Sequence, residues 1–274
     1  MQNALDAKEH FMSIKNDFWL WGQEANSHHE EGNNIYNLPG VNKMTPLEGA
    51  KFFGIKNMCM VVMEDKPSVE EFPKIADELS SLDKVVWSVF GNGGSKRTSD
   101  GGSDIAQMLE VAKNHPNIIA GVADDFMNDA RMKIYTPDVI KGYRDRLHNE
   151  IGRKLEFWAV LYAHELADKI KPFVDVFDVI TFWNWRSDTL LMLDENLERL
   201  KALAGQNKPI YAGCYMWDYG NHKPMTTDMM KYQLDKYLEL YEQGKIKGVI
   251  LCSNCIADLG LDTVDYTREW LARQ

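Results

Sequence analysis

The sequence predicts a single (β/α)₈ barrel, the TIM-barrel form of the α/β class, spanning residues 1–274. Three observations support this prediction. Eight apolar segments of strand length alternate with helical patterns, and six of those segments end in a cluster of polar or aromatic residues. The chain length of 274 residues is close to the roughly 250 that one such barrel needs. The alternation fills the whole chain, so no block remains for a second domain.

The expected strands are rich in Val, Ile, Phe and Trp, as strands covered on both faces should be. In chain order they span residues 16–21, 57–63, 85–90, 117–123, 155–162, 176–183, 208–216 and 247–253. Residues 1–15 are expected to form a short helix over the bottom or side of the barrel, and a last helix is expected at about 263–272. Helix-start signals lie between the strands: Thr45 and Thr136 each precede a proline, Ser68 opens a capping box, and Ser103, Ser187 and Thr226 are further caps.

The composition limits the partners. Hydrophobic residues make up 45% and charged residues 26%, which is typical of a globular protein with an ample core. The net charge of −10 disfavours nucleic acid and anionic membrane surfaces, because phosphates would be repelled. No apolar run reaches roughly 18 residues, so no membrane insertion is expected. Residues 1–15 lack an apolar signal core, which indicates a cytoplasmic protein or one whose leader was removed; the oligomeric state stays open.

Four cysteines in a chain of this length do not indicate a disulfide framework. Cys59, Cys214 and Cys252 lie in expected strands and are interpreted as buried thiols. Cys252 and Cys255 form a CxxC pair, but no second CxxC or His pair accompanies it, so neither a redox nor a zinc role is expected. No cofactor and no metal is therefore predicted.

The six clusters at strand ends are the candidate site. They span residues 19–24, 122–126, 161–165, 181–185, 214–219 and 251–254. In a parallel barrel all strands end at the same face, which carries the active site. The clusters place indoles and phenols beside carboxylates, and a sugar offers a C–H face that stacks on indole and hydroxyls that bind carboxylates and amides. The pattern therefore favours a carbohydrate ligand.

Strand alternation indicates which side chains face the axis, provided that no bulge interrupts it. In the strand at 117–123 it places Ile119, Gly121 and Ala123 inward, which favours Asp125 over Asp124 as the carboxylate at the mouth. The two long loops, 22–44 with His28 and 91–102, are interpreted as solvated or mobile segments. In the later strands the inward rows contain Trp158, Tyr162, His164, Trp183, Trp185, Tyr211, Tyr215 and Trp217, of which Trp158 and Tyr211 are interpreted as core packing.

Glycoside hydrolysis requires two carboxyl groups, one to protonate the leaving oxygen and one to attack or to activate water. The candidate catalytic residues are Asp124, Asp125, Asp218 and Glu165. Asp218 follows the seventh strand and lies across the barrel from Asp125, so it is the first choice of partner; Glu165, out of phase in its strand, is the second. The candidate substrate-binding residues are Trp21, Tyr162, His164, Trp183, Asn184, Trp185, Tyr215, Trp217 and Asn254.

Over its full length the chain resembles the TIM-barrel glycoside hydrolases in general. An α-amylase arrangement would use Asp124 or Asp125 with Glu165 and Asp218, but its arginine two residues before the nucleophile is replaced by Val122 or Ala123. The clan with paired glutamates would need Asn-Glu at 124–125, where this chain has Asp-Asp. The α-galactosidase type would need an aspartate on the sixth strand, which here ends in Trp-Asn-Trp. Residues 177–185 and 213–220 also resemble bacterial barrel proteins described only as glycosidase-like. The resemblance implies a barrel hydrolase without selecting one family.

Two other classes stay open. A metal-dependent sugar isomerase or epimerase would use carboxylates and imidazole around a divalent ion, and Glu64, Asp125, His164 and Asn254 are the set that the sequence offers. A non-catalytic carbohydrate-binding barrel would keep the aromatic side chains and need no carboxyl pair.

Overall fold

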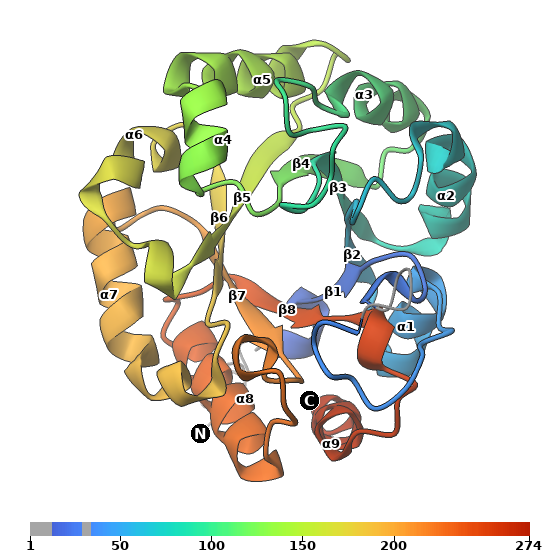
Figure 1. Ribbon diagram of the computed structural model, residues 1–274, viewed down its shortest axis with the longest axis vertical. Helices are drawn as coiled ribbons and strands as arrows, with labels where there is room; N and C mark the ends of the chain where they lie inside the picture. The colour runs from blue at the N-terminus through green and yellow to red at the C-terminus, as the bar shows by residue number, and fades with distance from the viewer. Residues whose placement is uncertain (1–12, 29–33) are drawn as a thin grey trace, which may run out of the picture.

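The computed structural model describes residues 13–28 and 34–274. Eight parallel strands form a closed barrel in sequence order, with helices around the outside (Figure 1). The predicted (β/α)₈ barrel is therefore confirmed. The strands are β1 (Phe18–Gly22), β2 (Asn57–Met60), β3 (Lys84–Phe90), β4 (Ile118–Ala123), β5 (Glu156–Tyr162), β6 (Val179–Trp183), β7 (Ile210–Tyr215) and β8 (Gly248–Cys252).

The α-helices of the described chain are α1 (Pro46–Phe53), α2 (Phe72–Glu78), α3 (Ile105–Asn114), α4 (Asp129–Ile134), α5 (Pro137–Asn149), α6 (Lys171–Val174), α7 (Leu193–Ala204), α8 (Thr227–Glu242) and α9 (Asp262–Ala272). Thr45, Thr136 and Thr226 cap α1, α5 and α8 through their side chains, as the sequence indicates. The helix expected at 1–15 lies almost wholly outside the described residues, which show only a short 3₁₀ turn, η1 (Ile14–Asp17).

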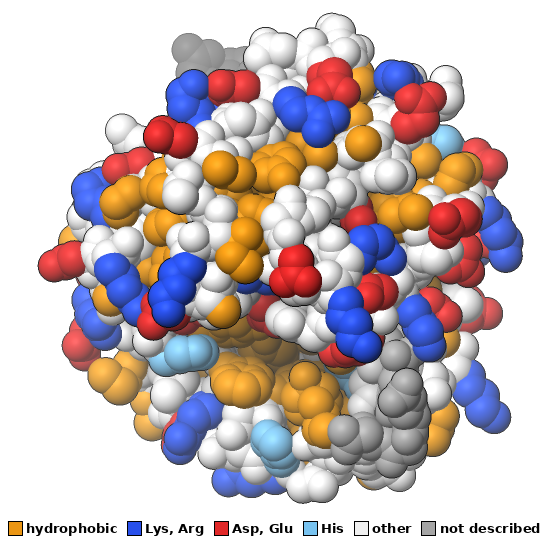
Figure 2. All heavy atoms as spheres, turned by 45° about the horizontal axis from the view of Figure 1, so that its top comes forward, with side chains coloured by type: hydrophobic (Ala, Val, Ile, Leu, Met, Phe, Trp, Pro, Cys, Tyr) orange, Lys and Arg blue, Asp and Glu red, His pale blue; other side chains and the backbone are white. Residues whose placement is uncertain are grey.

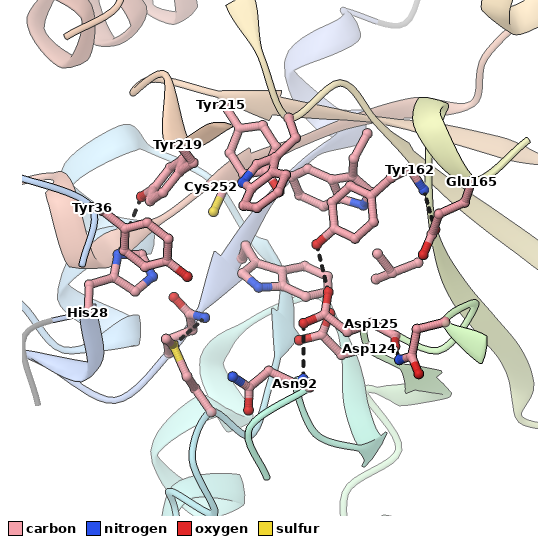
Figure 3. Close-up of a pocket in the computed structure, with 18 of the residues that line it drawn as sticks. His28, Tyr36, Asn92, Asp124, Asp125, Tyr162, Glu165, Tyr215, Tyr219 and Cys252 are labelled. Carbon is pink, nitrogen blue, oxygen red and sulfur yellow. Dashed lines mark hydrogen bonds between the residues drawn. The ribbon is translucent and has the colours of Figure 1, made fainter. Parts of the chain in front are cut away.

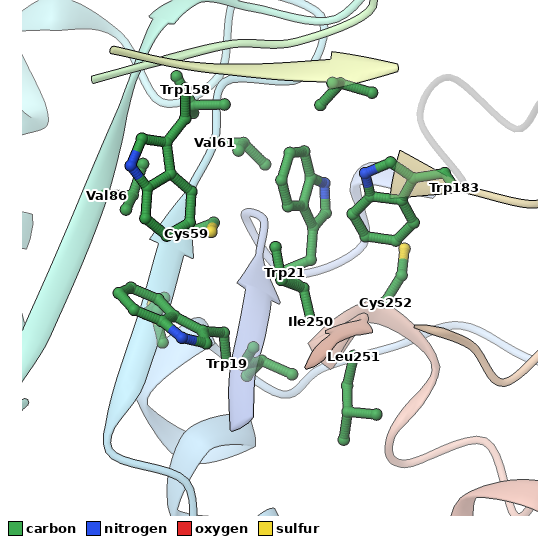
Figure 4. Packing of buried hydrophobic residues seen from close by; sticks show 14 of the residues in the cluster. Trp19, Trp21, Cys59, Val61, Val86, Trp158, Trp183, Ile250, Leu251 and Cys252 are labelled. Carbon is green, nitrogen blue, oxygen red and sulfur yellow. The ribbon is translucent and has the colours of Figure 1, made fainter. Parts of the chain in front are cut away.

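The barrel interior is filled by large aromatic side chains (Figure 4). The Trp158 ring lies 5.2 Å from the Trp19 ring and stacks at 4.6 Å on Tyr211, so Trp158 and Tyr211 are core packing, as expected. One level higher, the Trp183 ring of β6 packs over Gly213, its register partner on the neighbouring strand β7. A Cβ on Gly213 would lie 2.0 Å from the Trp183 ring, so only glycine allows this approach. These rings separate the barrel core from the space above it.

The expected orientation of β4 is wrong, because a bulge reverses it. Val85 of β3 pairs with Ile118, yet Val86 pairs with Ala120, so Ile119 is an extra residue in the ladder. Beyond the bulge, Val122 is in register with the inward Trp158. Gly121 faces outward, where a Cβ would meet Val89 and Leu147 of α5. One inserted residue exchanges the two faces of a strand, so Asp124, not Asp125, continues the inward row.

Candidate active site

A cavity of about 390 Å³ opens at the C-terminal ends of the strands. Figure 2 shows its mouth as a hollow with hydrophobic side chains in its depth. The cavity contains most of the residues that the sequence selects: Trp21, Asp124, Asp125, Tyr162, His164, Glu165, Trp183, Trp185 and Tyr215 all line it. Asp218, Trp217, Asn184 and Asn254 are not among its lining residues.

Asp125 enters the cavity through a turn rather than through strand alternation. Its φ is 44°, a left-handed conformation that aspartate adopts more readily than most residues. The Tyr162 hydroxyl donates to Oδ1 at 2.7 Å, and the Gly93 amide donates to Oδ2 at 3.0 Å. Asn128 donates to the Asp125 carbonyl at 2.7 Å and fixes the turn. Both carboxylate oxygens thus accept hydrogen bonds, which fix the orientation of the carboxylate in the cavity.

Asp124 lies deeper and is only 5% exposed. Burial, and then the neighbouring charge of Asp125, raise the pKa of Asp124 well above its ordinary value. The Arg131 guanidinium opposes this shift in the pKa of Asp124, but it donates its hydrogen bonds to the carbonyls of Asp124 and Asn92. The two adjacent aspartates therefore have different environments: the carboxylate of Asp125 accepts hydrogen bonds, and the carboxyl group of Asp124 is desolvated.

Glu165 belongs to η5 (Ala163–Glu165), which follows β5 directly. Its Oε2 accepts a hydrogen bond from the Tyr162 amide at 2.9 Å, so the residue also caps this turn. The pKa of Glu165 is raised to about 7. Burial is the largest cause and the charge of Asp125 adds to it, while the hydrogen bond from Tyr162 acts in the opposite direction. A carboxyl with a pKa near 7 exchanges its proton close to neutral pH.

Aromatic rings form the wall beside these carboxyls. Tyr162 and His164 stack at 5.4 Å, and the Trp185 ring lies 6.3 Å and 6.2 Å from them. Trp185 is 40% exposed and forms the rim, whereas Trp183 is only 2% exposed and forms the floor. Burial lowers the pKa of His164, which favours its neutral form at neutral pH.

The opposite wall consists of residues that the sequence analysis missed. Figure 3 shows His28, Tyr36 and Tyr219 grouped across the cavity from Tyr162 and Asp125. The Tyr219 hydroxyl lies 3.3 Å from His28 Nδ1, and the Tyr36 ring packs edge-on against both rings. His28 is 5% exposed, so the solvated loop expected there is wrong at this residue. The signal for His28 and Tyr36 was the unusual length of the 22–44 loop, and the signal for Tyr219 was its place in the strand-end cluster 214–219.

The loop at 91–102 also forms part of the cavity, since Asn92 and Gly93 line it. It is bound to the loop that connects β2 to α2. Asn92 donates to Glu64 Oε1 at 3.1 Å, and the Asp65 carboxylate accepts the amides of Lys96 and Arg97 at 3.1 and 2.9 Å. These contacts fix the Gly93 amide that binds Asp125.

Four candidates lie outside the cavity lining. Trp217 and Asp218 do so because the chain turns after β7 and the inward row of that strand ends at Tyr215. Asp218 is fully buried and accepts hydrogen bonds from Ser187 and Asn221. Trp217 is buried and donates to the Tyr36 carbonyl at 3.0 Å, behind the wall. Asn254 is buried and binds the backbone of Gln23. Asn184 is buried as well, and neither its amide oxygen nor its amide nitrogen has a hydrogen-bond partner within residues 13–28 and 34–274.

Among residues 13–28 and 34–274, no group of three or more His, Cys, Asp and Glu side chains has an arrangement that could hold a metal ion. Asn254, one of the set named for an isomerase, uses its amide on the backbone of Gln23 and Met44. The cysteines at 59, 214, 252 and 255 are free and buried, and burial raises the pKa of the Cys252 thiol well above its ordinary value. Within these ranges, no helix has both the length and the apolar character to cross a membrane.

Comparisons with known proteins find structural relatives only. No family model matches the chain, and no curated protein matches it. A candidate alpha-L-fucosidase from Bacteroides thetaiotaomicron is 11% identical with a TM-score of 0.55, over 84% of this chain and 88% of that one. An endo-beta-N-acetylglucosaminidase from Cordyceps militaris is 12% identical with a TM-score of 0.54, over 94% and 90%.

The same fold occurs in a protein of different chemistry. An F420-dependent secondary alcohol dehydrogenase is 8% identical with a TM-score of 0.52, over 93% of this chain and 96% of that one. At these identities the similarity shows the fold alone, a TIM barrel that enzymes of different chemistry share.

Proposed function

We propose that the protein hydrolyses a glycosidic bond, with Asp125 and Glu165 as its catalytic carboxyl groups. The observation that carries this proposal is that Asp124, Asp125 and Glu165 line one cavity whose walls and floor are aromatic. Three carboxyl groups around one cavity repel one another when ionised, and such clusters are typical of sites where proton transfer occurs. The aromatic surround fits the C–H face of a sugar ring.

The environments of the carboxyls suggest their roles. Asp125, with a donor on each oxygen, is the carboxylate that attacks the anomeric carbon or takes a proton from the attacking water. Glu165, with its pKa raised to about 7, is the acid that gives its proton to the glycosidic oxygen as the bond from that oxygen to the anomeric carbon breaks. Water then supplies the hydroxyl of the new hemiacetal.

Asp124 has a supporting role in this proposal. Because burial keeps its carboxyl protonated to higher pH, Asp124 offers a hydrogen-bond donor at the bottom of the cavity. A neutral Asp124 also avoids a second negative charge beside Asp125. The alternative acid is Asp124 itself. If Glu165 is the acid, Glu165→Gln loses the proton donor; if Asp124 is the acid, Asp124→Asn loses it.

The cavity size bounds the substrate. About 390 Å³ is at the lower end of the roughly 300–1,000 Å³ of ligand pockets, which suits one or two sugar rings inside the barrel mouth. Trp183 and Trp21 lie at the floor, and the exposed Trp185 is placed to stack on a further ring at the rim. The glycosidases among the structural relatives support the proposal by fold analogy only.

A panel of 4-nitrophenyl glycosides and oligosaccharides tests the proposal. The wild-type protein should hydrolyse at least one member, and both Asp125→Asn and Glu165→Gln should lose that activity while they remain folded. A protein that binds sugars and hydrolyses none is a carbohydrate-binding barrel. Sugar isomerisation without hydrolysis, abolished by EDTA, would replace the proposal with the isomerase class.

A further inference from the structure

Gln23 is a polar residue of the cavity whose side-chain amide lacks a strong hydrogen-bond partner among the described residues. It follows β1, lines the cavity and is only 5% exposed. Its Oε1 atom is buried and has no hydrogen-bond partner among the residues that the structure describes. Its Nε2 atom donates to the Met63 sulfur at 3.3 Å. A thioether is a weak acceptor, so in either orientation of the amide one end lacks a strong partner.

The backbone of Gln23, in contrast, is fixed on both sides. The Gln23 amide donates to Asn254 Oδ1 at 2.8 Å, and Asn254 Nδ2 donates to the Gln23 carbonyl at 2.9 Å. Asn42 in turn donates to the Asn254 carbonyl at 2.9 Å. Asn254 and Asn42 are buried, so this support is rigid. The protein therefore holds Gln23 in place while leaving its amide unsatisfied, at a cost to stability.

The position of Gln23 relates it to the carboxyls. β1 and β5 are opposite strands of the closed barrel (Figure 1). Gln23 follows β1 and lines the cavity, so it lies on the side opposite Tyr162 and Glu165. A sugar ring on the Trp183 floor would have the carboxyls at one edge and Gln23 at the other. An amide carries no charge and can both donate and accept, which matches a ring hydroxyl better than an amine or a carboxylate.

We infer that Gln23 is a specificity residue whose amide binds one hydroxyl of the sugar ring next to the cleaved bond. The inference rests on the proposed glycosidase function and adds the chemistry of the ring, a neutral sugar with a free hydroxyl at that position. A buried group without a partner rejects a ligand that cannot supply one, so Gln23 selects against the analogue that lacks this hydroxyl.

Gln23→Met tests the inference without a known substrate. It keeps the length of the side chain and removes the amide, and the protein should unfold at the same or a higher temperature, because an unpaired polar group is removed. Asn254→Leu is the matched control, since it removes an amide with both ends bonded to backbone. It should lower the unfolding temperature by about 5 °C or more. A similar loss in Gln23→Met would overturn the inference by showing a structural role.

The second measurement uses the 4-nitrophenyl glycoside that the wild type hydrolyses fastest, together with its monodeoxy analogues. The wild type should prefer the parent over one analogue by about tenfold or more. Gln23→Met should lower kcat/KM on the parent at least about tenfold and treat that analogue and the parent alike. Unchanged kcat/KM and unchanged discrimination would overturn the inference, since the amide then binds only an ordered water.

A thermal-unfolding assay with free sugars distinguishes failure of the proposed hydrolase function from failure of the inference about Gln23. If no glycoside is hydrolysed, glucose, galactose, fucose and N-acetylglucosamine are tested for raising the unfolding temperature. A sugar that stabilises the wild type and not Gln23→Met keeps the binding role of Gln23 while the hydrolase proposal falls. If none of these sugars stabilises the wild type, both fall.

Discussion

Replacement of Asp125 by asparagine should abolish activity and leave the fold intact. Asparagine adopts the left-handed backbone conformation at least as readily as aspartate, so the φ of 44° is tolerated. Its Oδ1 can accept the Gly93 amide, and its NH₂ can donate to the Tyr162 hydroxyl, which is able to reverse its role. Both contacts survive in neutral form, and we expect the free energy of unfolding to change by about 1 kcal/mol or less.

The activity should fall far more. Loss of the carboxylate that attacks the anomeric carbon, or that serves as base, should lower kcat/KM at least about 10³-fold, which corresponds to about 4 kcal/mol of transition-state stabilisation. The assay is hydrolysis of the best glycoside of the panel, with thermal unfolding as the check on folding. Near-normal turnover of Asp125→Asn would remove Asp125 from the mechanism.

Asp65 offers a matched control for this variant. It also has a positive φ, 63°, and its carboxylate also accepts backbone amides, those of Lys96 and Arg97, but it does not line the cavity. Asp65→Asn loses one of these two amide contacts and loosens the loop that carries Gly93, so it should lower kcat/KM by about tenfold at most, far less than Asp125→Asn. An equal loss of activity in both variants would indicate that the turn, and not the carboxylate of Asp125, is what matters.

Three further predictions follow from the same geometry. With Glu165 as the proton donor, wild-type activity should decline as the pH rises through about 7, because the pKa of Glu165 is raised to that value and its acid form is lost above it. Glu165→Gln should remove this alkaline decline along with most of the activity. An unchanged pH profile in Glu165→Gln would transfer the role of proton donor to Asp124. Gly213→Ala should cost about 3 kcal/mol or more in a denaturant titration, because its Cβ would lie 2.0 Å from the Trp183 ring; a stability close to the wild type contradicts the packing described. Trp185→Ala should raise KM for an oligosaccharide about tenfold with little effect on the unfolding temperature. The control is Leu191→Ala, which also truncates an exposed apolar side chain but lies outside the cavity lining, and it should leave KM unchanged.

The eight-fold alternation was enough to predict the barrel and to place the strand ends within a few residues. Buried parallel strands require continuous apolar runs, and Thr45-Pro46 and Thr136-Pro137 mark helix starts by local chemistry alone. The alternation in β5 and β6 also predicted that Tyr162 and Trp183 face the cavity, because no irregularity interrupts those strands there.

Only the tertiary structure decided which carboxyls share the cavity. The bulge at Ile119 reverses β4, and the left-handed turn at Asp125 then returns that side chain to the mouth beside Asp124. Residues 118–123 are small or apolar, so no polarity pattern reveals the inserted residue. Asp218 sits buried among hydrogen-bond donors because the chain turns after β7, and His28 and Tyr36 reach the cavity through a loop that follows no period. Local sequence determines the period of an element, whereas bulges, turns and loop paths depend on contacts between segments distant in the chain.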